Sequence, residues 1–134
     1  MEPVKIGILG LGTVGSGTVN VLTRNADEIQ RRAGRGIRVV SAAARDLKRK
    51  RNCPTEGIRL TADPQEIVND PEVEVVVELM GGYEPARTLV LQAIANGKHV
   101  VTANKAMIAA HGNEIFAAAQ KKGVMVAFEA AVAG

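Results

Sequence analysis

The stretch that decides the fold occupies residues 4–15, and its sequence is VKIGILGLGTVG. Its first half is a short apolar run that predicts a buried strand. Glycines follow directly, and residues 13–32 then carry apolar side chains at helical spacing. Residues 4–32 are therefore expected to form a strand, a tight glycine turn and a helix.

The glycine turn has the spacing G-x-G-x-x-G, with Gly10, Gly12 and Gly15 at the fixed positions. In a strand–turn–helix unit the first glycine permits the tight turn, the second lets the backbone approach a pyrophosphate, and the third lets the helix pack closely on the strand. The start of the helix adds free N–H groups and the positive end of the helix dipole. We therefore predict that this turn, with Thr13 and Val14, binds the pyrophosphate of a nicotinamide dinucleotide. A flexible glycine turn without a ligand is the alternative.

The rest of the chain alternates strand-like and helix-like segments. Strands are expected at residues 37–44, 58–61, 73–80, 98–102 and 124–128, and helices at residues 64–68, 85–95, 104–110 and 113–122, the last two divided at His111 and Gly112. Strands that alternate with helices pair in parallel through right-handed crossovers. The predicted fold is α/β, a Rossmann-type doubly wound, mainly parallel sheet with helices on both faces, built as one domain from residues 1–134.

The composition agrees with such a sheet and argues against other classes. Apolar residues make up 46% of the 134 residues and aromatic residues 2%, so the core is expected to consist of aliphatic side chains. The net charge is +3 and the basic residues crowd into residues 31–51 without aromatic residues between them, which argues against nucleic-acid binding. The sequence has neither a signal peptide nor an 18-residue apolar span, and Cys53 is its single cysteine, so we expect a cytoplasmic protein that does not enter a membrane.

The end of the second predicted strand is expected to contact the adenosine ribose. Ala44 closes that strand and Arg45 follows it. An acidic residue there would accept a hydrogen bond from the 2′-hydroxyl, whereas an arginine accommodates a 2′-phosphate. Arg45 lies farther from the glycine turn than the usual spacing of about 20 residues, so the first helix must be long, and Asp46 takes this place if the strand ends one residue later. The sequence favours NADP, with NAD also usable, and a solvated basic loop is the alternative for residues 45–51.

Two further strand ends should lie at the same edge of the sheet, where ligands of open parallel sheets bind. The candidate cofactor-binding residues at these ends are Gly81, Gly82, Thr102, Asn104 and Lys105. Lys105 would stand in the first turn of a helix, where the dipole disfavours a cation, and this suits a lysine that exchanges protons with a reacting oxygen. A solvated surface lysine is the alternative.

Four segments together resemble homoserine dehydrogenase. They are GILGLGTVGSG from residue 7, VVVELMGGYEPA from residue 75, HVVTANKA from residue 99 and FEAAVAG from residue 128. The first is shared by many dehydrogenases, whereas TANK and FEAAVAG are more specific to this family, and the match covers nearly the whole chain. The resemblance implies an NAD(P)-dependent oxidoreductase that interconverts homoserine and aspartate 4-semialdehyde by hydride transfer, on the route to threonine, methionine and isoleucine.

The resemblance also implies roles for individual residues. Lys105 corresponds to a catalytic-site lysine that contacts both cofactor and substrate, and Arg45 to an arginine that meets the 2′-phosphate. Glu129, Val132 and Gly134 correspond to a turn whose backbone oxygens bind a monovalent cation, usually sodium.

The chain stops at residue 134 on a predicted strand that leads into nothing further, and the substrate-binding and dimerisation region of the family would lie beyond it. We therefore expect a fragment of a longer, homo-oligomeric enzyme that binds the cofactor but does not turn over substrate alone. Two other functions stay open: another Rossmann-type oxidoreductase of a small aldehyde or amino acid, and a non-catalytic module that senses NAD(P)H. A catalytic role for Lys105 would separate a dehydrogenase from a sensor.

Overall fold

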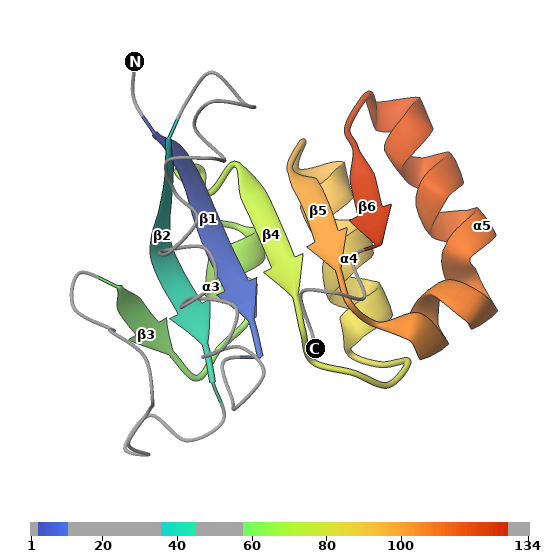
Figure 1. Ribbon diagram of the computed structural model, residues 1–134, viewed down its shortest axis with the longest axis horizontal. Helices are drawn as coiled ribbons and strands as arrows, with labels where there is room; N and C mark the ends of the chain where they lie inside the picture. Colours follow the sequence, from blue (N-terminus) through green and yellow to red (C-terminus); the bar gives the residue numbers. More distant parts are fainter. Residues whose placement is uncertain (1–2, 11–35, 45–57, 129–134) are drawn as a thin grey trace.

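The computed structural model describes residues 3–10, 36–44 and 58–128. These residues form a six-stranded sheet in the order β3-β2-β1-β4-β5-β6, in which every neighbouring pair is parallel (Figure 1). The strands are β1 (Val4–Leu9), β2 (Ile37–Ala43), β3 (Arg59–Thr61), β4 (Val75–Glu78), β5 (His99–Thr102) and β6 (Val126–Phe128). The chain adds strands outward from β1 to β3 and then outward from β4 to β6, so the strand order reverses between β1 and β4. The predicted doubly wound parallel sheet is confirmed.

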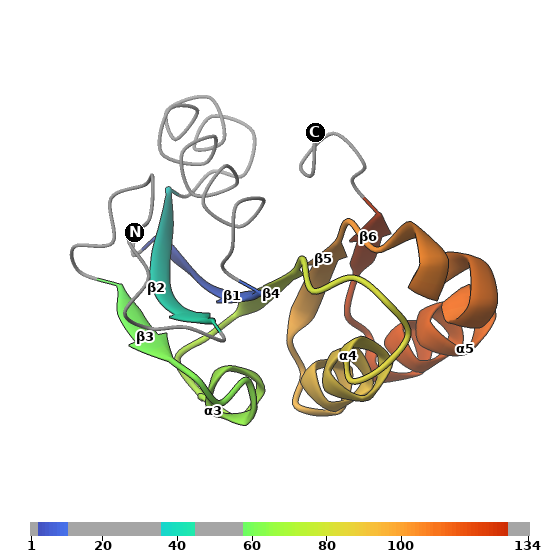
Figure 2. The same ribbon diagram turned by 90° about the horizontal axis from the view of Figure 1, so that it is seen from below.

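The helices of the described part are α3 (Gln65–Val68), α4 (Ala86–Ala95) and α5 (Lys105–Lys122). All three lie on one face of the sheet, as the view along its edge shows (Figure 2). The helix predicted over residues 13–32, which would supply the other face, lies outside the described residues.

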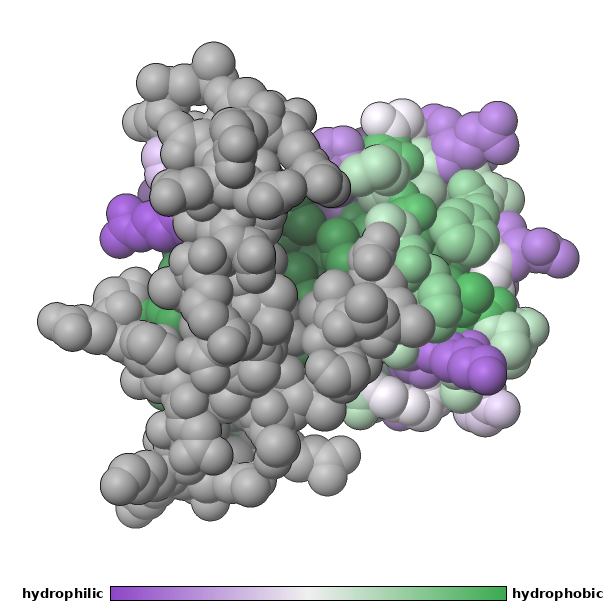
Figure 3. Space-filling view, in the orientation of Figure 1, coloured by the Kyte–Doolittle hydropathy of each residue, from purple (hydrophilic) through white to green (hydrophobic). Residues whose placement is uncertain are grey.

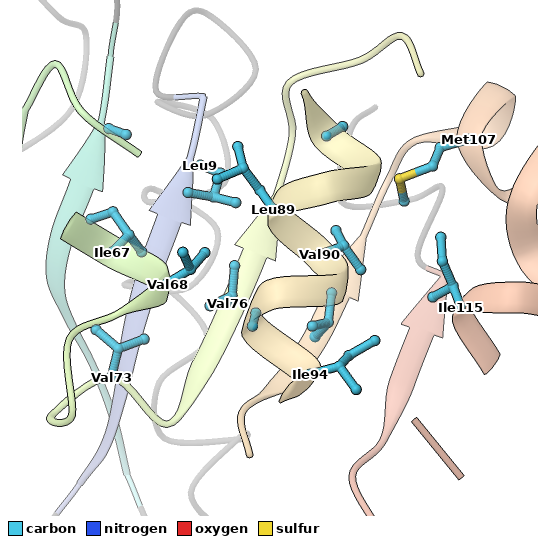
Figure 4. Packing of buried hydrophobic residues seen from close by; sticks show 14 of the residues in the cluster. Leu9, Ile67, Val68, Val73, Val76, Leu89, Val90, Ile94, Met107 and Ile115 are labelled. Atoms are coloured by element: carbon cyan, nitrogen blue, oxygen red, sulfur yellow. The ribbon is translucent and has the colours of Figure 1, made fainter. Parts of the chain in front are cut away.

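The core consists of aliphatic side chains on both faces of the sheet. Successive strand residues alternate between the faces: Leu9 and Val76 pack against the helices, whereas Ile8 and Val77 belong to a second cluster on the opposite face. The helix-side cluster brings together side chains from the sheet and from α3, α4 and α5 (Figure 4). In the space-filling view, which shows the opposite face, apolar residues gather over β4, β5 and β6 (Figure 3). Burial on both faces explains why the strands are continuous apolar runs rather than alternating ones.

Helix α3 lies directly on β1 because the strand has a glycine at the point of contact. A Cβ atom on Gly7 would be 2.6 Å from Cγ2 of Ile67, which is closer than two carbon atoms can approach, and 3.2 Å from a methyl group of Val73. Ile67 is itself fully buried. Gly7 therefore serves the packing of the sheet.

The predicted break at His111 and Gly112 is wrong, because α5 runs through both residues without interruption. Gly112 is buried, and it lies on the same side of α5 as Met107 and Ile115, which pack against the core. A glycine within a helix costs only about 1 kcal/mol relative to alanine. The buried apolar stripe of a long helix outweighs that cost, so the glycine does not end the helix.

Candidate functional site

The carboxyl ends of β1 and β4 meet where the strand order reverses, which is where ligands of doubly wound sheets bind. Gly10 follows β1 with φ +92°, and its N–H donates to the carbonyl oxygen of Ala43 over 3.1 Å. A Cβ atom at this position would lie 3.1 Å from both Cα and N of Met80, which follows β4. Gly10 therefore has the left-handed backbone conformation that the predicted tight turn requires at its first glycine. Gly12, Thr13, Val14 and Gly15, which complete the motif, lie outside the described residues.

The end of β2 lies beside this reversal. Ala44 is buried, and its N–H donates to the carbonyl oxygen of Thr61 over 2.9 Å, so the chain leaves the sheet at the same edge as Gly10. Arg45, expected to contact the adenosine end of a dinucleotide, is the next residue and lies outside the described part of the chain.

The loop after β4 presents bare backbone at the same edge. Gly81 and Gly82 are exposed and have φ values of +76° and +71°. A Cβ atom on either residue would meet nothing within 4 Å. These glycines are therefore required by the backbone conformation and not by crowding within the described chain.

A buried carboxylate links the ends of β4 and β5. Glu78 is the last residue of β4 and is fully buried. One carboxylate oxygen, Oε1, accepts a hydrogen bond from the hydroxyl of Thr102 over 2.6 Å, and the other, Oε2, accepts one from the N–H of Met80 over 2.7 Å. Glu78 is not among the candidates that the motifs indicate, although an acidic residue closing the apolar run VVVE is a visible signal.

The hydrogen bonds continue from Thr102 into the start of α5. Oγ1 of Thr102 accepts the N–H of Asn104 over 3.0 Å, and Oδ1 of Asn104 accepts the N–H of Met107 over 3.0 Å, which is an N-cap bond. The side-chain amide of Asn104 also donates to the carbonyl oxygen of Gly82 over 2.6 Å. Asn104 therefore connects the two loops that the sequence assigns to the cofactor.

Lys105 is the first residue of α5, and its side chain is exposed. The helix position expected for Lys105 is confirmed. Its N–H donates to the carbonyl oxygen of Ala103 over 3.1 Å, so its backbone belongs to the turn that Thr102 and Asn104 organise.

Charged side chains join α4 to α5 near the loop after β4. Arg87 on α4 forms ion pairs with Glu114 on α5 at 2.5 Å and with Glu84 at 3.4 Å. The hydroxyl of Thr88 and, after it, the Arg87 guanidinium hold the pKa of Glu84 below its usual value, against the effect of desolvation. Desolvation alone would lower the pKa of Arg87, but Glu114 and Glu84 raise it. Glu84 and Glu114 are exposed and Arg87 is half-buried, so solvent weakens these pairs and they orient the helices more than they stabilise them.

The opposite, amino-terminal edge of the sheet holds a different cation. Lys98 precedes β5 and is buried, and its Nζ donates to the carbonyl oxygens of Asp70 over 2.5 Å and of Val73 over 2.8 Å. Burial lowers the pKa of Lys98, and the carboxylate of Asp70 only partly offsets this effect. Lys98 therefore holds together the segment that connects α3 to β4, at the edge of the sheet opposite the glycine loops.

Within residues 3–10, 36–44 and 58–128, no group of three or more His, Cys, Asp and Glu side chains is placed to hold a metal ion. The predicted cation ligands Glu129, Val132 and Gly134 lie outside these residues. The two histidines have other contacts: Nδ1 of His99 accepts the N–H of Met125, and His111 packs edge-on against Tyr83. No described helix is long and apolar enough to cross a membrane.

Comparison with known proteins decides the family. A sequence model described as "Homoserine dehydrogenase, NAD binding domain" matches residues 10–129. The chain belongs to the homoserine dehydrogenase family. A homoserine dehydrogenase of Pseudomonas aeruginosa is 66% identical over 134 residues, and one of Neisseria gonorrhoeae is 54% identical over 137 residues. These alignments cover 100% of this chain but only 30% and 31% of the relatives, so the chain spans about a third of their length.

Solved homoserine dehydrogenase structures have the same fold. The structure from Thiobacillus denitrificans is 64% identical, with a TM-score of 0.88 over 98% of this chain and 30% of that chain. A structure from S. aureus is 39% identical, with a TM-score of 0.88 over 97% of this chain and 33% of that chain. The resemblance to homoserine dehydrogenase and the Rossmann-type fold are both confirmed.

Proposed function

We propose that this chain is the nucleotide-binding domain of a longer, NAD(P)-dependent homoserine dehydrogenase, which interconverts homoserine and aspartate 4-semialdehyde. The observation that carries the proposal is the position of Gly10, the first residue of the glycine motif, at the reversal between β1 and β4. Membership of the family supports the reaction, and the share of the relatives that the chain covers supports the view that other residues complete the enzyme.

The described residues fit a dinucleotide at the carboxyl edge. Met80 leaves no room for a side chain at position 10, so the chain passes the reversal between β1 and β4 as bare backbone, and no described atom would lie within 4 Å of a Cβ on Gly81 or Gly82. We assign the pyrophosphate to the glycine motif at residues 10–15, and the nicotinamide side to the loops that carry Gly82 and Asn104.

The chemistry divides between the cofactor and the chain. A bound nicotinamide dinucleotide supplies or accepts the hydride. Lys105 would hold or move the proton at the substrate oxygen, because it begins α5 at this edge and its side chain is free to reach a ligand. The remaining candidates bind and orient the dinucleotide.

We also propose that NADP binds more tightly than NAD, through Arg45 and the 2′-phosphate. A sodium ion at Glu129, Val132 and Gly134 belongs to the same proposal for the whole enzyme. The cytoplasmic location and the homo-oligomeric state stay predictions from the sequence.

Calorimetric titration of the chain with each dinucleotide tests the binding function and the preference. NADP is expected to bind about 10-fold to 100-fold more tightly than NAD, the range that a charge-assisted hydrogen bond supports. Arg45→Ala should remove this difference. Arg38→Ala is the control, because Arg38 is an exposed cation near the start of β2, at the opposite edge. Equal affinities for the two dinucleotides would contradict the role of Arg45, and no binding of either would contradict the proposed function.

Turnover is tested in a chimera in which residues 1–134 replace the matching segment of the Pseudomonas aeruginosa relative. The chimera should oxidise homoserine, whereas the chain alone should bind the dinucleotide without turnover. Lys105→Ala should lower kcat by about 10²-fold to 10⁴-fold, the usual contribution of a positioned proton-transfer group. Lys121→Ala, at the exposed far end of α5, is the matched control. An inactive chimera, or full activity of its Lys105→Ala variant, would reject the proposed roles.

A further inference from the structure

Glu78 is a buried acidic side chain for which the proposed reaction has no direct use. Glu78 lies at the end of an apolar strand, and its side chain has no exposed surface. Burying a carboxylate in this way is costly unless hydrogen bonds compensate for the lost hydration. Each of its oxygens accepts one hydrogen bond, from Thr102 and from the backbone of Met80. The carboxylate is therefore satisfied, and it joins the ends of two neighbouring strands.

The donors and acceptors fix the direction of this network. The hydroxyl of Thr102 has a single proton, and its oxygen accepts the N–H of Asn104 while that proton points to Glu78. The arrangement requires two acceptor oxygens at position 78 and a hydroxyl at position 102. A glutamine at position 78 would offer one acceptor and one donor, so it would face one of its two donor partners with another donor.

The network ends at Gly82 and at Met107, in the first turn of the helix that Lys105 begins. Asn104 is oriented through its own N–H by Thr102, and its side chain then caps α5 at Met107 and holds the carbonyl of Gly82. A shift of the turn that holds Asn104 would therefore move both the first residue of α5 and the loop after β4.

We propose that Glu78 is a positioning residue, which acts through Thr102 and Asn104 to fix the start of α5, and with it Lys105, relative to the Gly82 loop. This inference rests on the proposed function, because it is the catalytic role of Lys105 that gives the position of the turn its importance. A small misplacement of a catalytic group is enough to slow a reaction by about 10²-fold.

Four variants test the proposal in the chimera: Glu78→Gln, Thr102→Val, Thr102→Ser and Glu72→Gln. Glu78→Gln and Thr102→Val break the bond between Glu78 and Thr102 from each of its two sides without a large change in volume. Both are expected to lower kcat about tenfold or more, with KM for homoserine within about threefold of the unaltered value. Thr102→Ser retains the hydroxyl, so its kcat should lie within about twofold of the unaltered value. Glu72→Gln removes the same charge from the exposed connection before β4 and should have no effect.

The double variant Glu78→Gln/Thr102→Val shows whether the two residues act together. If they belong to one network, kcat of the double variant should be close to that of the slower single variant. Independent losses that multiply would overturn the proposal. An unchanged kcat in Thr102→Val would also overturn it. So would a loss of kcat that is fully explained by the fraction of unfolded protein in each variant.

Amide hydrogen exchange in the chain itself supplies a measurement that does not depend on turnover. Thr102→Val should speed exchange of the Asn104 and Met107 N–H groups about tenfold or more, while exchange at Ile115, in the core part of α5, stays unchanged. Thr102→Ser should retain protection at both sites. Unaltered protection in Thr102→Val would reject the network whatever the chimera does, whereas inactivity of the unaltered chimera would reject the proposed function alone.

Discussion

Replacing Gly10 by alanine should disturb both the stability of the sheet and the binding of a dinucleotide. The backbone at Gly10 has φ +92°, where an L-residue is strained by about 1–2 kcal/mol. The new Cβ would also lie 3.1 Å from Cα and N of Met80, so backbone atoms of two adjacent strands would have to separate by a few tenths of an ångström. Crowding of this kind costs about 1–3 kcal/mol.

The expected net effect is smaller than the sum of these costs. Alanine lowers the conformational entropy of the unfolded chain relative to glycine, and this alone raises the free energy of unfolding by about 0.4–1 kcal/mol. Gly10→Ala should therefore lower the free energy of unfolding by about 1–5 kcal/mol, with about 3 kcal/mol at the middle of the range. Its dinucleotide affinity should fall at least about tenfold, since the ends of β1 and β4 move apart at the point where the backbone must approach the ligand.

Gly123→Ala is the matched control. Gly123 ends α5 with φ +81°, and a Cβ there would meet no atom of the described residues within 4 Å. Only the conformational cost remains, so the loss should be about 1 kcal/mol, with unchanged dinucleotide affinity. The chain has no Trp, so urea unfolding is best followed by circular dichroism, with calorimetry for binding. Equal losses of stability in the two variants would refute the contact with Met80 as the cause.

Two further predictions concern Lys98 and Asn104. Because burial lowers the pKa of Lys98 below its ordinary 10.5, the folded chain binds fewer protons than the unfolded chain between that lowered pKa and 10.5. The free energy of unfolding of the chain, compared with that of Lys98→Met, should therefore rise as the pH increases toward 10.5, and a constant or shrinking difference in urea unfolding would contradict this. Asn104→Ala should cost about 1–2 kcal/mol through loss of the N-cap, whereas Asn104→Ser, whose hydroxyl can cap the helix but which loses the bond to Gly82, should cost less. Equal losses in the same unfolding measurement would show that the cap contributes nothing.

The fold was predictable because its signals are local. The apolar run before Gly10 and the regular alternation of strands and helices each depend on neighbouring residues, and they lead to the observed doubly wound parallel sheet. The continuity of α5 was not predictable from the same signals, because Gly112 has low intrinsic helix preference and only packing against the core overrides it.

The candidate site was predictable in its positions but not in its connections. The ends of the predicted strands indicate Gly82, Asn104 and Lys105, since parallel strands place their carboxyl ends at one edge. The bond between Glu78 and Thr102 joins residues 24 positions apart, and it depends on the register of β4 and β5, which no local pattern contains. Nor does the sequence indicate that Met80 is the neighbour that excludes a side chain at Gly10.

The parallel arrangement of the six strands also makes this chain suitable for attachment to a sensor surface. Every candidate ligand contact of the described part lies at the carboxyl edge, whereas the turns after α4 and α5 lie at the amino edge. Lys121, exposed in the last turn of α5, is therefore a good site for a cysteine that carries a fluorophore or an immobilising linker, once Cys53 has been replaced. A chain tethered in this way would present its cofactor edge to the solution.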